Sequence, residues 1–124
     1  MQQRTAMKKI LVVDDDTDIL LLLKAKLSAT GYNVTTTTSC TEGLNVFYTS
    51  LPDLVLLDIN VGSEDGREMC RSIKQQADYE HIPVILISAN PEALKLYADY
   101  GATAAVDKPF ELNHLLDLIT KHLN

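Results

Sequence analysis

ILVVDDDTD, residues 10–18, is the stretch that decides the fold, because a short apolar run stops abruptly at clustered aspartates. A strand that is apolar on successive residues is typical of a parallel sheet covered on both faces. The residues that follow such a strand lie at its carboxyl end, where parallel α/β sheets carry their ligand sites. Like charges this close are costly unless a cation or a basic group neutralises them. The stretch therefore predicts a parallel strand with a cation site at its end.

The rest of the chain alternates short apolar runs with helical patterns, which predicts an α/β fold with a parallel sheet. The expected strands are residues 9–13, 33–37, 54–57, 84–88 and 104–106, and the expected helices are residues 17–30, 41–50, 66–76, 91–100 and 111–123. Gly31 follows the first helix as a typical C-terminal residue, and Pro91 suits a first helical position. Five β–α units result, and periodicity by itself leaves the order of the strands open.

Composition and charge indicate how many domains the chain has and which kinds of partner and location are expected. The chain has 124 residues, 46% of them hydrophobic, which is enough for one domain with a sizeable core. Seventeen acidic against eleven basic residues give a formal charge of −6, which would repel a nucleic-acid backbone, so we expect no direct nucleic-acid binding. The sequence has no run of eighteen apolar residues and no apolar stretch near its start, so we expect no membrane segment and a cytoplasmic location. Cys40 and Cys70 form no CxxC pair and are expected to be reduced thiols.

The aspartates after the first strand divide into two pairs. Asp14 and Asp15 follow the strand directly and are the candidate metal ligands. Oxygen ligands without clustered His or Cys favour Mg²⁺, and an EF-hand loop counted from Asp14 would lack its glycine and its final glutamate. Asp16 and Asp18 lie where a helix begins, and a carboxylate there is favourable for the helix dipole whatever the function.

Polar residues also end three further strands. Asp58 follows the third strand, Ser88 closes the fourth and Lys108 follows the fifth. An aspartate can attack a phosphoryl group and form an acyl phosphate when a divalent cation and a fixed positive charge are present. Lys108 can supply that charge, and the Ser88 hydroxyl can donate to a phosphate oxygen. Each residue also has an ordinary interpretation as a turn, strand-end or surface residue, but their joint position at one sheet edge favours the chemical one.

Four segments in order, ILVVDDD, LVLLDINVGSEDG, PVILISA and GATAAVDKPF, resemble the receiver domain of two-component response regulators. The resemblance covers residues 8–123 and implies a CheY-like, flavodoxin-like (βα)5 three-layer sandwich with sheet order 2-1-3-4-5. On this interpretation residues 1–124 are a single receiver domain with its core at 8–123.

The resemblance also implies a phosphorelay function in signal transduction. Asp58 is then phosphorylated by a histidine kinase or phosphotransfer protein, with Mg²⁺ held by Asp15, Asp58 and the backbone carbonyl of Asn60. Asp14 helps to position the metal through water. The modified domain switches its binding to a downstream protein or effector domain, as a monomer or a phosphorylation-dependent dimer. Such a domain is not a conventional enzyme, but it catalyses its own phosphorylation and its slow dephosphorylation.

The remaining positions implied by the resemblance surround the phosphoryl group. Ser88 and Lys108 hold that group, and Ala89 leaves room for the donor. Asn60 and Asn90 occupy the positions that influence how water reaches the phosphate. Both side chains are neutral and able to hydrogen-bond, so we expect ordinary rather than very slow self-hydrolysis.

Two departures from the family pattern keep an alternative open. Gly62 stands where many members have proline, and Ala105 stands at the switch position where many carry a rotating Tyr or Phe. They motivate a constitutive interaction module whose output is independent of phosphorylation. Tyr97 and Tyr100 lie nearby in sequence and are expected to pack in part. A metal-dependent phosphatase is a weaker alternative, because its DxDxT pattern would require Thr at Asp18.

Overall fold

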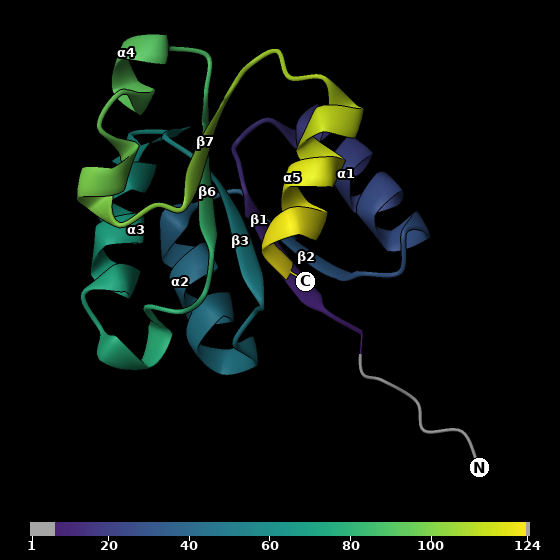
Figure 1. Cartoon of the computed structure of the whole chain (residues 1–124), viewed down its shortest axis with the longest axis horizontal. Coiled ribbons are helices and arrows are strands. Elements are labelled where there is room, and N and C mark those ends of the chain that lie inside the picture. Colours follow the sequence, from purple (N-terminus) through teal and green to yellow (C-terminus); the bar gives the residue numbers. More distant parts are fainter. Residues whose placement is uncertain (1–6, 124) are drawn as a thin grey trace.

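The computed structural model describes residues 7–123, so the start of the chain, considered above for a signal, lies outside the described residues, as does residue 124. Five parallel strands form the central sheet in the order β2-β1-β3-β6-β7 (Figure 1). Their bounds are β1 (Lys9–Val13), β2 (Asn33–Thr37), β3 (Leu54–Asp58), β6 (Val84–Ser88) and β7 (Ala104–Asp107). Numbered without the short strands β4 and β5, this is the predicted order 2-1-3-4-5, and the flavodoxin-like three-layer fold is confirmed.

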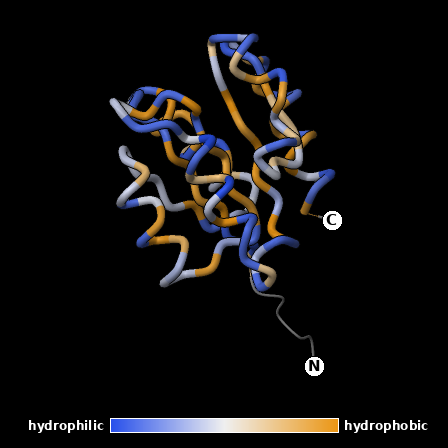
Figure 2. Tube along the Cα trace, turned by 90° about the vertical axis from the view of Figure 1, so that its left-hand side faces the viewer, coloured by the Kyte–Doolittle hydropathy of each residue, from blue (hydrophilic) through white to orange (hydrophobic). Residues whose placement is uncertain are grey.

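Helices cover both faces of the sheet (Figure 1). One face carries α1 (Thr17–Ala29) and α5 (Leu112–Leu123), and the other carries α2 (Cys40–Ser50), α3 (Gly66–Lys74) and the short α4 (Pro91–Leu94). Successive residues of a strand point to opposite faces, so β1 contributes to both cores. Leu11 and Val13 pack on the α2–α3 side, whereas Ile10 and Val12 pack on the α1–α5 side. Figure 2 shows the hydrophobic segments concentrated in the interior between these layers.

The expected helix over residues 91–100 is wrong as a single helix. The α-helix ends at Leu94, and Leu96 leaves the helical region with φ −107° and ψ 35°. A 3₁₀ turn, η2 (Tyr97–Tyr100), follows and ends at Gly101, which has a φ of 85°. The guanidinium groups of Arg67 and Arg71 on α3 lie over the Tyr100 ring, 5.4 and 4.4 Å from its centroid. Packing of this ring against α3 favours the bend over a continued helix.

A small hairpin after β3 is not foreseen by the periodicity. Strands β4 (Asn60–Val61) and β5 (Glu64–Asp65) pair antiparallel, and Gly62 at the turn has a φ of 61°. That left-handed conformation suits glycine. Val61 is buried in the core on the α2–α3 side and holds the hairpin against the body of the protein.

The other differences from the expected elements are small. A 3₁₀ turn, η1 (Ala77–Tyr79), follows α3, which ends at Lys74 rather than residue 76, and β3 and β7 each extend one residue further.

Cys40 and Cys70 are free and buried, and burial raises the pKa of each thiol to about 11. Over residues 7–123, no helix is both long and apolar enough to cross a membrane.

Candidate functional site

Three carboxylates meet at the carboxyl ends of β1 and β3. These two strands are direct neighbours with Val13 opposite Leu57, so the residues that follow them lie side by side. Asp14, Asp15 and Asp58 each place a carboxylate oxygen within 4.8 Å of the others. Asp14 and Asp58 are buried, whereas Asp15 is exposed. Oxygen ligands clustered at this spacing, with one side open, fit a Mg²⁺ ion that keeps several of its waters.

Lys108 enters the same cluster from β7. Its ammonium group lies 2.8 Å from Asp14 Oδ2 and 3.1 Å from Asp58 Oδ2. The backbone N–H of Lys108 donates to the Ser88 carbonyl at 2.8 Å, which joins the ends of β6 and β7, and the Lys108–Pro109 peptide is cis. Burial lowers the pKa of Lys108, but hydrogen bonds to the two carboxylates outweigh it and leave the pKa raised. One ammonium group among three carboxylates leaves a surplus of negative charge.

This surplus of negative charge helps to raise the pKa of the Asp58 carboxyl group. Its pKa is raised from 3.8 to about 6, first by burial and then by repulsion from Asp14, while the Lys108 hydrogen bond acts in the opposite direction. The Asn60 N–H donates to Asp58 Oδ1 at 3.3 Å, so both carboxylate oxygens have a donor. An added cation stabilises the negatively charged form of a carboxyl group that is buried and only partly neutralised.

Ser88 lies at the end of β6 and is fully buried. Its hydroxyl oxygen accepts from the Asn90 N–H at 3.0 Å, and within residues 7–123 no hydrogen bond joins it to Asp58. The Asn90 side chain in turn accepts from the Glu92 N–H at 3.1 Å and caps α4. The fold thus brings Ser88 to the correct sheet edge, while its hydroxyl hydrogen stays available to a new acceptor.

Asp16 and Asp18 have the helix-start roles expected of them. Asp16 is the N-cap of α1, and its Oδ1 accepts from the N–H groups of Asp18 and Ile19 at 3.0 and 3.3 Å. Asp18 lies in the first turn. The clustered carboxylates that could share a cation do not include either residue.

Ala105 lies on β7 opposite Leu86 and is half-buried. It packs against the α2–α3 side of the core, as Tyr97 and Tyr100 also do in part. The expected packing role of these two tyrosines is confirmed.

Two residues that follow Asp58 make contacts beside the site that the sequence-based prediction did not include. A Cβ atom at Gly66 would collide with the Asp58 carbonyl oxygen, so only glycine fits where α3 begins. Glu64 links the β4–β5 hairpin to α2, since its carboxylate accepts from the Cys40 N–H and the Thr41 hydroxyl. The Asp65–Gly66 pair is a turn signal that could have marked the first of these. No local pattern indicates which distant groups either residue meets.

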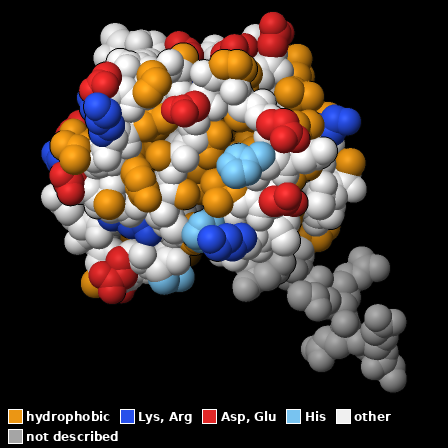
Figure 3. All heavy atoms as spheres, turned by 45° about the horizontal axis from the view of Figure 1, so that its top comes forward, with side chains coloured by type: hydrophobic (Ala, Val, Ile, Leu, Met, Phe, Trp, Pro, Cys, Tyr) orange, Lys and Arg blue, Asp and Glu red, His pale blue; other side chains and the backbone are white. Residues whose placement is uncertain are grey.

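An apolar groove of about 380 Å³ lies beside Lys108. It is lined by Ile19 and Leu22 of α1, by Ala89, and by Lys108, Pro109 and Phe110 after β7. Figure 3, which brings the carboxyl edge of the sheet forward, shows hydrophobic side chains interspersed with acidic ones over this face.

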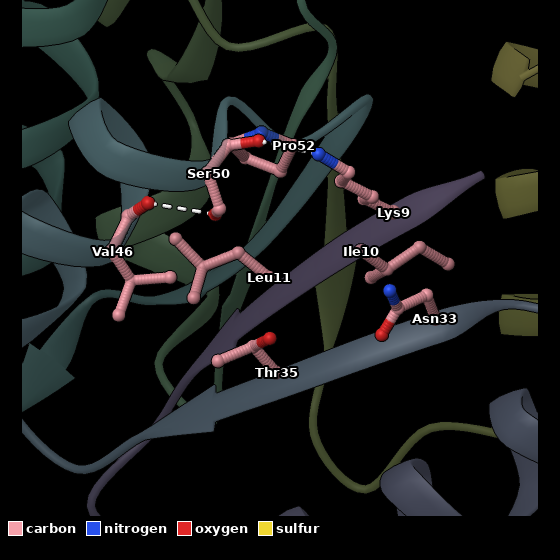
Figure 4. A pocket seen from close by; sticks show the side chains of 8 residues that line it. All are labelled: Lys9, Ile10, Leu11, Asn33, Thr35, Val46, Ser50 and Pro52. Carbon is pink, nitrogen blue, oxygen red and sulfur yellow. Dashed lines mark hydrogen bonds between the residues drawn. The ribbon is translucent and has the colours of Figure 1, made fainter. Parts of the chain in front are cut away.

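A separate cavity of about 160 Å³ opens near the starts of β1 and β2 (Figure 4). Leu11 and Thr35 lie on its strand side and Val46 and Ser50 on its α2 side. Since strands begin at this end, the cavity is at the opposite edge of the sheet from the carboxylates and is not part of their site.

Comparison with known proteins places this geometry in a family. The family model described as response regulator receiver domain matches residues 10–120. The chain is 35% identical over 112 residues to the response regulator ArlR of Staphylococcus aureus, covering 89% of this chain and 50% of that protein. It is 34% identical over 110 residues to the probable transcriptional regulator ycf27 of Guillardia theta, covering 87% of this chain and 42% of that protein. The chain therefore spans about half the length of these curated relatives.

Solved structures agree with the sequence matches. A CheY-like response regulator receiver domain protein of Methanospirillum hungatei superposes with a TM-score of 0.87 at 30% identity, covering 95% of this chain and 94% of that one. The receiver domain of NtrX from Brucella abortus superposes with a TM-score of 0.83 at 32% identity, covering 92% and 97%. With its sheet order and its matched residues 10–120, the chain belongs to the response regulator receiver domain family of two-component systems.

Proposed function

We propose that this receiver domain accepts a phosphoryl group on Asp58 from a histidine kinase or phosphotransfer protein. The observation that carries the proposal is the meeting of Asp58 with Asp14, Asp15 and Lys108 at one sheet edge. An Asp58 oxygen attacks phosphorus, the phosphorus–nitrogen bond of the donor breaks, and its electron pair stays on the imidazole. Hydrolysis then returns the carboxylate and inorganic phosphate.

The residues of the site would divide these tasks. Asp15, Asp58 and the Asn60 carbonyl would hold Mg²⁺, and Asp14 would position it through water. When bound, Mg²⁺ would neutralise charge on the transferred oxygens. Lys108 already lies 3.1 Å from Asp58 and would pair with a phosphoryl oxygen, while Ser88 would donate its hydroxyl hydrogen.

The apolar groove supports a protein as the donor. Ile19, Leu22 and Phe110 line it next to Lys108, so a partner that covers the groove would reach the edge that carries Asp58. Ala89 lines the same groove with a small side chain and would leave room for the donor. A cytoplasmic location is part of this proposal, and the two free cysteines support it.

Phosphorylation would act as a switch. Added charge on Asp58 would draw Ser88 and Lys108 inward and alter the face around α4, β7 and α5, which would change binding to a downstream protein or effector domain. We propose that residues 1–124 act as one receiver unit with its core at 8–123, as a monomer or a phosphorylation-dependent dimer.

The test is incubation with acetyl phosphate, with and without Mg²⁺, followed by intact mass measurement. Wild type should gain one phosphoryl group only with Mg²⁺. Asp58→Asn should gain none, whereas Asp16→Ala should keep most of the modification. A wild type that stays unmodified by acetyl phosphate and by histidine kinases alike would rule the proposal out.

A constitutive interaction module is the second candidate, favoured by the small Ala105 side chain at the position where an aromatic ring would rotate. The two candidates differ in output rather than in chemistry. Sedimentation and partner affinity that stay unchanged after full modification of Asp58 would favour the constitutive module.

A further inference from the structure

Glu64 joins the segment that follows Asp58 to the helix α2. It lies on β5, six residues after Asp58. Its Oε1 accepts from the Cys40 N–H at 2.8 Å, and its Oε2 accepts from the Thr41 hydroxyl at 3.0 Å. Both carboxylate oxygens are therefore used in holding β5 against the beginning of α2.

The N-terminus of α2 favours this contact. Its N-cap, Ser39, accepts from the Glu42 N–H at 3.1 Å, which leaves the Cys40 N–H in need of another acceptor. Glu64 supplies that acceptor with a negative charge at the positive end of the helix dipole. Glu42 lies in the same first turn of α2, and in the part of the chain that the structure describes its carboxylate makes no hydrogen bond to the hairpin.

The hairpin that Glu64 holds is bonded to two of the three clustered carboxylates. The Gly62 N–H donates to Asp15 Oδ2 at 2.9 Å, and the Asn60 N–H donates to Asp58 Oδ1 at 3.3 Å. At the far end of the hairpin, the Gly66 N–H donates to the Ile59 carbonyl at 2.6 Å. A displacement of the hairpin would therefore move the Asp15 carboxylate and the Asn60 backbone together.

We propose that Glu64 is a positioning residue of the acceptor site, which holds the β4–β5 hairpin on α2 so that the Asn60 carbonyl and the Asp15 carboxylate keep the arrangement that Mg²⁺ requires. Mg²⁺ demands near-ideal octahedral geometry, so a small shift of two ligands lowers its affinity. Residues that orient metal ligands commonly change metal affinity by about 10- to 100-fold. The inference rests on the proposed function for the identity of the metal and for the chemistry.

The experiment compares Glu64→Ala with Glu42→Ala, which removes a carboxylate from the same helix end without touching the hairpin. In the metal-free protein, hydrogen exchange of the amides of residues 60–65 should quicken in Glu64→Ala only. Titration with MgCl₂, followed through backbone amide shifts, should give an affinity about tenfold weaker for Glu64→Ala and unchanged for Glu42→Ala.

Phosphorylation kinetics separate positioning from a general structural defect. For Glu64→Ala, the Mg²⁺ concentration giving half the maximal acetyl phosphate rate should rise about tenfold, while the rate at saturating Mg²⁺ should stay within about twofold. Glu64→Gln keeps an oxygen for the Cys40 N–H and should recover most of the affinity. If Glu64→Ala does not fold, Thr41→Val, which removes one of the two bonds, should still weaken Mg²⁺ binding.

Equal Mg²⁺ affinity in the wild type and in every folded Glu64 and Thr41 variant would overturn the inference. Failure of the proposed function has a different signature. In that case wild type and the variants would still rank as expected in Mg²⁺ affinity and in exchange rate, but wild type would gain no phosphoryl group.

Discussion

Asp58 illustrates how single residues set the chemistry of this site. Asp58 is buried next to Asp14, and Lys108 forms an ion pair with both carboxylates. The negative form of Asp58 is consequently less favourable than that of a solvated aspartate, which is why its pKa rises to about 6. A bound cation would therefore stabilise the negatively charged form of Asp58. A phosphoryl acceptor in a cation site needs this response to positive charge.

The raised pKa predicts how stability depends on pH in the metal-free protein. Between about pH 4 and about pH 6 the folded state binds more protons at Asp58 than the unfolded state does, so the free energy of unfolding should fall as pH rises through this window. A shift of about two units corresponds to about 3 kcal/mol lost above the window. Asp58→Asn should lack this pH-dependent part of the free energy of unfolding, as measured by urea unfolding with a chelator present.

Asp107→Asn provides the matched control, because Asp107 is an exposed carboxylate at the end of β7. It should keep the pH dependence of wild type. Parallel stability curves for wild type and Asp58→Asn would contradict the assigned pKa.

At the scale of elements, contacts between η2 and α3 override the local preference for a helix after Leu94. The sequence pattern favours a helix through residues 91–100, but the Tyr100 ring lies against Arg67 and Arg71 and the chain bends into η2. The Cys70 thiol also donates to the Tyr100 carbonyl at 3.3 Å. Because Arg67 is paired with Asp65 at the start of α3, these contacts join η2 to the segment that follows the site.

Replacing Tyr100 with Leu should therefore loosen η2 while keeping an apolar side chain there. Loss of the cation–π contacts should lower the free energy of unfolding by about 1 kcal/mol. Amide hydrogen exchange of residues 97–101 should become faster. Tyr97→Leu is the control, since within residues 7–123 no guanidinium lies over its ring, and equal exchange in the two variants would argue against the arginine contacts.

At the scale of the whole molecule, charge and topology act together. The chain carries a formal charge of −6, and the parallel sheet gathers three of its carboxylates at one edge. The same edge carries the apolar groove, whereas the cavity near Lys9 opens at the other end of the strands. The molecule thus has one end suited to a cation and a covering partner.

Mg²⁺ should accordingly stabilise the folded chain as a whole. At about 100 times its dissociation constant, the ion should raise the free energy of unfolding by about 3 kcal/mol. Urea unfolding in MgCl₂ and in NaCl of equal ionic strength would measure the gain. Asp15→Asn should lose most of it, while Asp18→Asn, in the first turn of α1, should retain it. An equal gain in both variants would place the ion elsewhere.

Local patterns in the sequence were sufficient for the five sheet strands, the order of elements and the residues at the strand ends, because apolar periodicity and turn residues depend on near neighbours. The positions of Asp14, Asp58 and Lys108 at strand ends predicted that they share one sheet edge, and the structure places Lys108 in contact with both aspartates. The resemblance added the strand order. Only the tertiary structure decided the break after Leu94, the hairpin at Gly62 and the contact of Glu64 with α2. The break and the Glu64 contact depend on segments far apart in the chain, and the hairpin, although its strands pair locally, is also bonded to Asp15 through the Gly62 N–H. No local pattern records the energies of such distant contacts.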